Sequence, residues 1–293
     1  MTNILENLNK DLNQDEKNRI IWLSIDIMTI CRSGKLRRRQ EIENYMKEML
    51  NELKEIEMEY SLILIPTFSY SFPKEKIFDT YATKTEVSAF GKYLIENITE
   101  RRSTNPFYSF IAFGREAEKF LQLALEDSVG KKSPFNYIHE KDSIMISIGH
   151  HFIKTLSSIH QVEYILNAKY RQLIEFSGII SRNGKQIKKG HFNFYGRKYE
   201  ECDFSGITFK GVELLKREEI FKVEILEMKS KKLVYYKLDL CRAAAFLEMK
   251  DAIKQGLIGP AKEGIELKEK ERPIEVNDSN KMYMKDLYNA NNR

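Results

Sequence analysis

The chain has 293 residues, of which 42% are hydrophobic and 31% charged, a balance typical of a folded globular protein rather than a disordered one. Its formal charge of +5 is a slight excess within a highly charged composition and does not indicate nucleic-acid binding. The cysteines, Cys31, Cys202 and Cys241, are odd in number and far apart, which argues against a disulfide framework and a paired-cysteine zinc site.

The longest strongly apolar segments are shorter than the roughly 20 residues that a membrane-spanning helix requires. They are IIWLSIDIMTI, which starts at Ile20, and LILIP, which starts at Leu62. The first residues, MTNILENLNKDLNQDEKN, do not have the form of a signal peptide. We therefore expect a cytoplasmic protein with no membrane partner.

Helices and buried strands alternate in the first part of the chain. The pattern predicts a polar helix over residues 1–18, a buried strand over 19–28 and an amphipathic helix over 39–60. A second buried strand is predicted over 61–72, and we expect it to end at Pro66 because proline cannot donate to a sheet ladder. Strand, helix and strand in this order imply a parallel pair.

The alternation continues in the middle of the chain. We predict helices near 85–99 and 115–126 and a third buried strand over 142–149. These elements indicate an α/β protein with a mixed, partly parallel central sheet flanked by helices. Ligands bind such sheets beyond the carboxyl ends of the parallel strands, which draws attention to Thr67, Ser69 and Ser71.

The last part of the chain changes character. The dipeptide at 183–184, Asn-Gly, predicts a hairpin turn, and residues 185–237 are expected to form an antiparallel region inserted after the helix that begins in SSIHQVEY. A final helix is predicted over 238–256 and ends at a capping glycine. We expect one domain over 1–262, followed by a charged, loosely held tail over 263–293.

The stretch SSIHQVEY, which starts at Ser157, contains the strongest local pattern. Ser158 followed by Gln161 is the sequence form of a capping box and predicts a helix that begins at Ser158. His160 and Glu163 then share one helix face, so that the carboxylate fixes the imidazole tautomer. The positive end of the helix disfavours a protonated imidazole and Glu163 favours it, which predicts a pKa near neutrality and suits a general base.

Two other interpretations of this pair stay open at this point. His160 can be a hydrogen-bonded histidine at a helix start, with Glu163 as a solvated first-turn acid. A metal site is also conceivable, but further ligands would have to come from His150, His151 or a distant acid without a recognisable spacing. We expect no metal.

The run CRSGKLRRRQ holds the main cluster of basic residues. It follows a predicted strand, where a phosphate-bearing ligand could bind, although a solvated helix start is the alternative. The basic residues are Arg32, Lys35, Arg37, Arg38 and Arg39.

Taken together, four stretches resemble the aminoglycoside 3-N-acetyltransferase family of antibiotic acetyltransferases. SLILIPTFSYSF resembles the strand of that family that ends in Pro-Thr-Phe, and RSTNPFYSFIAFG resembles its Arg-Ser-x-His/Asn-Pro-x-x-Ser-x-x-Ala-x-Gly segment. KKSPFNYI resembles its Ser-Pro-Phe element, and SSIHQVE resembles its Thr-x-x-His-x-x-Glu motif. Order and spacing agree, and the resemblance covers roughly residues 15–256.

The resemblance implies an acyl-CoA-dependent N-acetyltransferase and a role for each matched residue. His160 matches the catalytic base, Glu163 its orienting carboxylate, and Ser157 the hydroxyl three residues before the histidine. The residues that match segments of the acyl-CoA site are Thr67, Ser69, Arg102, Ser103 and Ser109. Caps or backbone hydrogen bonds are the alternative role for these hydroxyls.

Some positions depart from the family pattern. A His-Ser-Ser-like stretch usually ends the first strand and helps to hold the coenzyme, whereas this chain has WLSIDIM, with Ser24 and Asp26 as polar candidates. Ser157 stands in place of the more usual threonine, and Asn105 in place of a frequent histidine. Residues 185–237 match weakly, which suggests a specialised acceptor side.

Three classes of function follow from these observations. The first is transfer of an acetyl or other acyl group from coenzyme A to a primary amine. The favoured acceptor is a nucleotide-linked amino sugar used in surface glycan synthesis, and an antibiotic aminoglycoside is the alternative. A polycationic acceptor would suit the acidic YEECD segment, which starts at Tyr199. The second class is a non-catalytic coenzyme- or sugar-binding module of the same fold. The third, nucleic-acid binding through the arginine run, is not expected, and a homodimer is left open.

Overall fold

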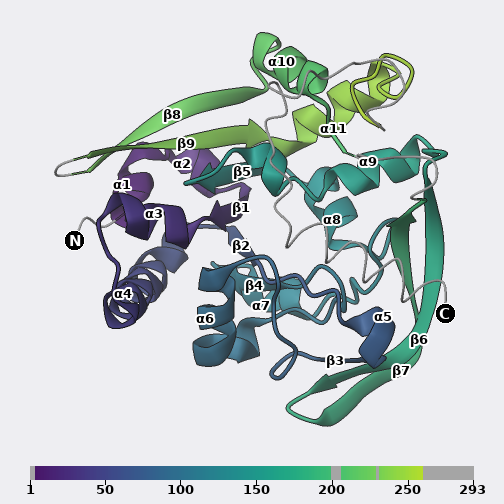
Figure 1. The fold of residues 1–293 in the computed structure, drawn as a ribbon, viewed down its shortest axis with the longest axis horizontal. Helices are drawn as coiled ribbons and strands as arrows, with labels where there is room; N and C mark the ends of the chain where they lie inside the picture. Colours follow the sequence, from purple (N-terminus) through teal and green to yellow (C-terminus); the bar gives the residue numbers. More distant parts are fainter. Residues whose placement is uncertain (1–3, 199–205, 229–230, 260–293) are drawn as a thin grey trace.

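The computed structural model describes residues 4–198, 206–228 and 231–259, which form two sheets and the helices around them (Figure 1). The strands are β1 (Ile20–Ile25), β2 (Leu62–Pro66), β3 (Ile77–Asp79), β4 (Phe110–Phe113), β5 (Ser143–Ile148), β6 (Arg171–Arg182), β7 (Lys185–Arg197), β8 (Phe221–Met228) and β9 (Lys231–Asp239). The α-helices are α1 (Ile4–Asp11), α2 (Gln14–Lys17), α3 (Ile27–Ser33), α4 (Arg39–Ile56), α5 (Phe72–Glu75), α6 (Ala89–Ile98), α7 (Ala117–Leu121), α8 (Pro134–Glu140), α9 (Ile159–Ile165), α10 (Phe209–Arg217) and α11 (Leu240–Met249). Short 3₁₀ helices cover Glu57–Glu59, Thr99–Arg101 and Phe152–Lys154.

The larger sheet has six strands in the order β4-β2-β1-β5-β9-β8. The three central strands, β2, β1 and β5, run parallel, and the outer strands pair antiparallel. This arrangement confirms the predicted α/β class with a mixed, partly parallel sheet. Every residue of the three central strands is buried, because helices cover both faces of the sheet.

Alternate residues of the central strands face two separate hydrophobic clusters. Trp22 and Leu64 belong to a cluster that includes side chains of α8, α9 and α11. Ile21 and Ile63 belong to the opposite cluster, with side chains of α1, α3, α4 and α6. The sheet is therefore the middle layer of a three-layer structure.

The smaller sheet has the order β3-β6-β7 and is dominated by the long β6–β7 hairpin. The turn between these strands has positive φ angles of 50° at Asn183 and 73° at Gly184, which the Asn-Gly dipeptide tolerates. This confirms the predicted hairpin. The carboxyl end of β7 returns toward α9 and reaches the functional site described below.

Several predicted elements differ from the structure. Residues 185–237 do not form one antiparallel region, because β7 lies in the small sheet, β8 and part of β9 lie in the large sheet, and α10 separates them. The predicted helix over 115–126 shrinks to α7. The predicted final helix begins later, since Asp239 accepts a hydrogen bond from the backbone N–H of Arg242 and caps α11, and it ends at Met249 rather than at Gly256.

Several helices were not predicted: α3, α5, α8 and α10. α3 starts directly after β1, because the carboxylate of Asp26 accepts hydrogen bonds from the backbone N–H and the hydroxyl of Thr29, 3.0 and 2.6 Å away. Within the described ranges, none of the helices has the length and apolar character needed to span a membrane. The predicted tail over 263–293 lies outside the described residues, and the division into one domain and a tail stays a prediction.

Candidate active site

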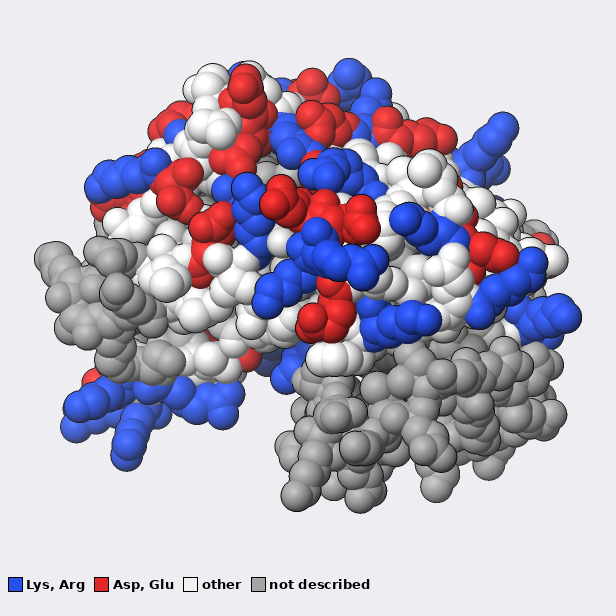
Figure 2. All heavy atoms as spheres, turned by 90° about the horizontal axis from the view of Figure 1, so that it is seen from above, with Lys and Arg blue, Asp and Glu red and all other residues white. Residues whose placement is uncertain are grey.

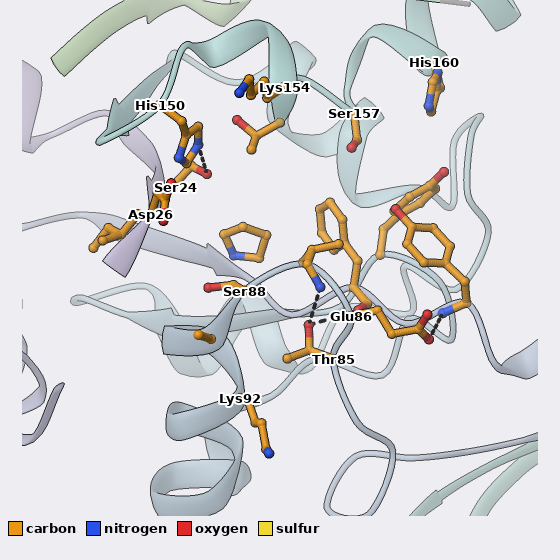
Figure 3. Close-up of a pocket in the computed structure, with 18 of the residues that line it drawn as sticks. Ser24, Asp26, Thr85, Glu86, Ser88, Lys92, His150, Lys154, Ser157 and His160 are labelled. Carbon is orange, nitrogen blue, oxygen red and sulfur yellow. Dashed lines mark hydrogen bonds between the residues drawn. The ribbon is translucent and has the colours of Figure 1, made fainter. Parts of the chain in front are cut away.

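A pocket of about 920 Å³ lies beyond the carboxyl ends of β1, β2 and β5. Its wall also includes the start of α6, the start of α9 and the carboxyl end of β7. β1 lies between β2 and β5, and such a position in an open α/β sheet is a common place for ligands. Figure 3 shows Ser24 and His150 toward one end of this pocket and Ser157 and His160 toward the other.

His160 and Glu163 form a hydrogen-bonded pair in the pocket wall. Nδ1 of the partly exposed imidazole lies 2.8 Å from Oε2 of the fully buried carboxylate. Since an ionised carboxylate can only accept, the pair assigns the proton to Nδ1 and leaves the lone pair on Nε2. The predicted helix face and the predicted tautomer control are therefore present in the structure.

Glu163 is held from two further directions by residues that the sequence did not point to. Nε of Arg171, at the start of β6, lies 2.5 Å from Oε2 of Glu163, and the hydroxyl of Tyr170 donates to Oε1 over 3.2 Å. Arg171 is itself buried, and its Nη1 donates to the carbonyl oxygen of Tyr195. The carboxylate thus has a buried cation, a hydroxyl and an imidazole around it, which fixes its position.

The electrostatics of this group differ from the prediction. Burial, followed by the charge of Arg171, lowers the pKa of His160 to about 4 and outweighs the opposite effect of Glu163. The predicted near-neutral pKa was wrong, because it counted Glu163 but neither the burial nor the arginine. For Glu163, burial acts to raise the pKa, but Arg171 and His160 together lower it below its usual range. At neutral pH the site therefore holds a neutral imidazole and an ionised carboxylate.

The start of α9 is stabilised in another way than predicted. Ser158 precedes the first helical residue, as expected, but its side chain makes no capping hydrogen bond. Gln161 instead accepts from the backbone N–H of Gly130 over 2.8 Å and donates to Asn136 over 2.9 Å. The predicted capping box was wrong: Gln161 instead links α9 to the segment before α8, through Gly130, and to α8 itself, through Asn136.

Ser157 lines the pocket in the segment just before α9. Its hydroxyl points into the open space of the pocket, on the same wall as His160 (Figure 3). A hydroxyl in that place can donate a hydrogen bond to a substrate oxygen.

The five residues expected to contact coenzyme lie behind the pocket wall, and none of them lines the pocket. All are buried: Thr67, Ser69, Arg102, Ser103 and Ser109. Their side chains bond to one another and to backbone. Direct contact with coenzyme stays a prediction, while the hydrogen bonds support the alternative, structural role.

Arg102 is the centre of this buried group. Its guanidinium donates to the carbonyl oxygen of Thr67 over 2.9 Å, to the hydroxyl of Ser109 over 3.1 Å and to the carbonyl oxygen of Thr83. Ser109 in turn donates to the carbonyl oxygen of Thr67 over 2.8 Å, and Ser103 accepts from the backbone N–H of Phe110. The network joins the end of β2 to β4 and to the 80–85 loop, and thereby shapes one pocket wall.

The opposite end of the pocket contains polar residues from the altered first strand. Oγ of Ser24 lies 3.1 Å from Nε2 of His150, and burial lowers the pKa of this imidazole to about 4. Asp26 caps α3 beside them. Across the pocket, Ser88 caps α6, and Gly91 lets this helix approach β2, since a Cβ there would lie 2.9 Å from the carbonyl oxygen of Pro66.

The basic run is separate from the pocket. The backbone N–H groups of Arg37 and Arg38 donate to Glu41, and the 93% exposed side chain of Arg39 pairs with Glu43. None of these residues lines the pocket. The contacts favour a solvated helix start rather than a phosphate site. The acidic YEECD segment lies outside the described residues. Within the residues that the structure describes, no three His, Cys, Asp or Glu side chains gather as a metal site would require.

A model of the aminoglycoside 3-N-acetyltransferase family matches residues 34–241, most of the chain. The chain belongs to this family. It is also 29% identical over 113 residues to the SPbeta prophage-derived aminoglycoside N(3')-acetyltransferase-like protein YokD of Bacillus subtilis (strain 168), a match that spans 38% of this chain and 38% of that protein. The expected N-acetyltransferase is thus confirmed at the level of the family.

Solved structures show the same fold at low sequence identity. The crystal structure of YokD from Bacillus subtilis has a TM-score of 0.58 at 18% identity and covers 85% of this chain and 98% of its own. AAC-VIa bound to sisomicin has a TM-score of 0.59 at 15% identity, and the match covers 84% of this chain and 95% of that one. AAC-IIIb with CoASH has a TM-score of 0.60 at 12% identity, and the match covers 88% of this chain and 97% of that one.

Proposed function

We propose that this protein transfers an acetyl group from acetyl-CoA to a primary amine of an aminoglycoside, with His160 as the general base. The observation that carries the proposal is the contact between Nδ1 of His160 and Glu163, because it leaves Nε2 as the proton acceptor in a wall of the pocket. Membership of the family supports the reaction and the acceptor class.

The reaction requires one proton transfer away from the amine. The amine nitrogen attacks the thioester carbonyl carbon, and the nitrogen becomes more acidic as the C–N bond forms. Nε2 of His160 takes this proton, and Glu163 stabilises the resulting imidazolium through Nδ1. The C–S bond then breaks, and the proton held on Nε2 of His160 passes to the leaving thiolate of coenzyme A, which returns the imidazole to its neutral form. Because the pKa of His160 is lowered to about 4, its imidazole is neutral at neutral pH and its Nε2 is free to accept the proton of the amine.

A negative charge develops on the carbonyl oxygen of the thioester during the attack. Ser157 lies on the same pocket wall as His160, and its hydroxyl is the donor that we assign to this oxygen. Direct transfer needs no covalent intermediate on the protein, and no cysteine lines the pocket among the residues that the structure describes.

The pocket and the comparisons also bear on the acceptor. The sequence favoured a nucleotide-linked amino sugar whose diphosphate would bind near Arg37–Arg39, but that run lies outside the pocket wall. A solved relative of the same fold is bound to sisomicin, an aminoglycoside. Both observations favour the aminoglycoside, which was the alternative acceptor.

The test is an acceptor screen with purified protein and acetyl-CoA. Release of free thiol is followed with sisomicin, gentamicin and a set of nucleotide-linked amino sugars, and each product is identified by mass spectrometry. We expect thiol release and a mono-acetylated product with an aminoglycoside. Turnover with nucleotide-linked sugars alone would overturn the assigned acceptor but keep the acetyltransferase, whereas binding of acetyl-CoA without turnover of any amine would favour the non-catalytic module.

A further inference from the structure

β8 is the outer strand of the six-stranded sheet, and among the described residues its only strand partner is β9 (Figure 1). Open edge strands in monomeric proteins are usually short, bulged, interrupted by proline or lined by charged side chains. β8 has eight residues without proline, and its register with β9 is regular from Phe221 to Met228. A long, regular edge of this kind can pair with a strand of another chain.

The backbone groups that face outward can be identified. The N–H of Asp239 donates to the carbonyl oxygen of Ile220, which makes these two residues a hydrogen-bonded pair in the antiparallel ladder. Bonding alternates along such a ladder, so Lys222 and Glu224 also bond toward β9. The N–H and C=O groups of Phe221, Val223 and Ile225 therefore point to the open edge.

The side chains around this edge are unusually apolar for a surface. Val223 is 49% exposed and Ile225 51%, and Val234 opposite Ile225 on β9 is 42% exposed. Leu226, on the other face of the ribbon, is buried in the cluster that contains α1. The exposed apolar residues thus lie on one face, next to the outward-facing backbone groups.

Lys222 and Glu224 of β8 are complementary to the same two residues of an antiparallel copy. If Val223 lies opposite Val223 of the partner subunit, Phe221 lies opposite Ile225 of the partner subunit, so all outward-facing backbone groups meet each other. Lys222 then lies opposite Glu224 of the partner subunit, and the two-fold axis repeats the pair. The face of the molecule seen from above in Figure 2, the side on which β8 and α10 lie in Figure 1, carries interspersed charges of both signs, so copies can approach without a repulsive field of one sign.

We propose that two copies of this chain form a dimer by antiparallel pairing of β8 with β8 around Val223, which joins the two six-stranded sheets into one. The register is specified by two Lys222–Glu224 pairs, and the apolar residues on either side become cross-strand neighbours. The two strands meet along an isologous interface. No pocket residue lies on β8, so this interface is independent of the acetyltransferase site.

The test uses charge reversal and sedimentation velocity over roughly 1–100 µM protein. We expect a concentration-dependent dimer for the wild type, and a dissociation constant at least about tenfold larger for Lys222→Glu and for Glu224→Lys, since each variant places two like-charged pairs across the axis. An equimolar mixture of the two variants should recover a heterodimer, because every Lys then faces a Glu. This recovery also shows that both variants are folded.

Three results would overturn the proposal. They are a wild type that stays monomeric over the whole range, a single variant that keeps the wild-type dissociation constant, and a mixture that stays monomeric. Val223→Pro is the backbone control: it removes an N–H that faces outward and leaves the ladder to β9 intact, so it should also yield a monomer.

Discussion

The guanidinium of Arg171 lies 2.5 Å from the same carboxylate oxygen of Glu163 that holds the imidazole of His160. The arginine comes from β6 and the other two residues from α9, so the small sheet supplies part of the electrostatics of a site built on the large one. Arg171 does not react in the proposed mechanism. It is a positioning residue that keeps Glu163 ionised and His160 neutral.

The first prediction concerns Arg171→Gln. Removing the cation should raise the pKa of His160, so that the acid limb of the kcat/KM profile moves upward from about pH 4. It should also destabilise the fold by roughly 3–5 kcal/mol, because Glu163 is left as a buried charge with one partner fewer. The measurement is a pH–rate profile at a temperature where the variant is folded. Arg171→Lys keeps the charge and should shift the limb less; an unmoved limb in Arg171→Gln would show that the arginine does not control His160.

The second prediction concerns stability in acid. Burial lowers the pKa of His139, His150 and His160 to about 4 each, from an ordinary value of 6.5. Between these pH values the unfolded chain binds protons that the folded chain does not, so the free energy of unfolding should fall as the pH falls from about 6.5 to about 4. The limiting slope for three histidines is roughly 4 kcal/mol per pH unit.

Urea unfolding at several pH values measures this slope. His139→Gln removes one of the three groups at a position away from the pocket. It should therefore reduce the slope of the free energy of unfolding against pH by about one third. Equal slopes for this variant and the wild type would mean that folding does not lower the pKa of His139.

The third prediction separates the two roles of the buried hydroxyls. Thr67→Val removes a hydroxyl that lies 3.1 Å from both the carbonyl and the hydroxyl oxygens of Ser109, and should cost about 1–3 kcal/mol of stability. Because Thr67 does not line the pocket, the KM for acetyl-CoA should change by less than about twofold, and Thr67→Ser should restore stability. A large rise in KM with unchanged stability would instead support the direct coenzyme contact that the family resemblance implies.

Sequence patterns predicted the parts of this protein that depend on local chemistry. The three central strands were recognisable because burial on both faces requires continuous apolar runs, and the turn at Asn183 because Asn-Gly tolerates positive φ. The His160–Glu163 contact followed from three-residue spacing on one helix face.

The missed features depend on residues that are distant in the sequence. Arg171 reaches Glu163 only because β6 returns beside α9, and no local pattern marks it. Gln161 had the spacing of a capping box but bonds to Gly130 and Asn136 instead. The hydroxyl of Thr67 follows a parallel strand, as a ligand-binding residue does, yet tertiary packing buries it against Ser109.

The most direct test of the central claim is the rate of acetyl transfer by His160→Ala under saturating acetyl-CoA and aminoglycoside. His191→Ala, an exposed histidine on β7 outside the pocket, is the matched control. We predict that kcat falls by about 10²–10⁴-fold in His160→Ala and stays at the wild-type value in the control, while acetyl-CoA binding measured by calorimetry is retained. A His160→Ala protein that keeps its wild-type kcat would contradict the assignment of His160 as the general base.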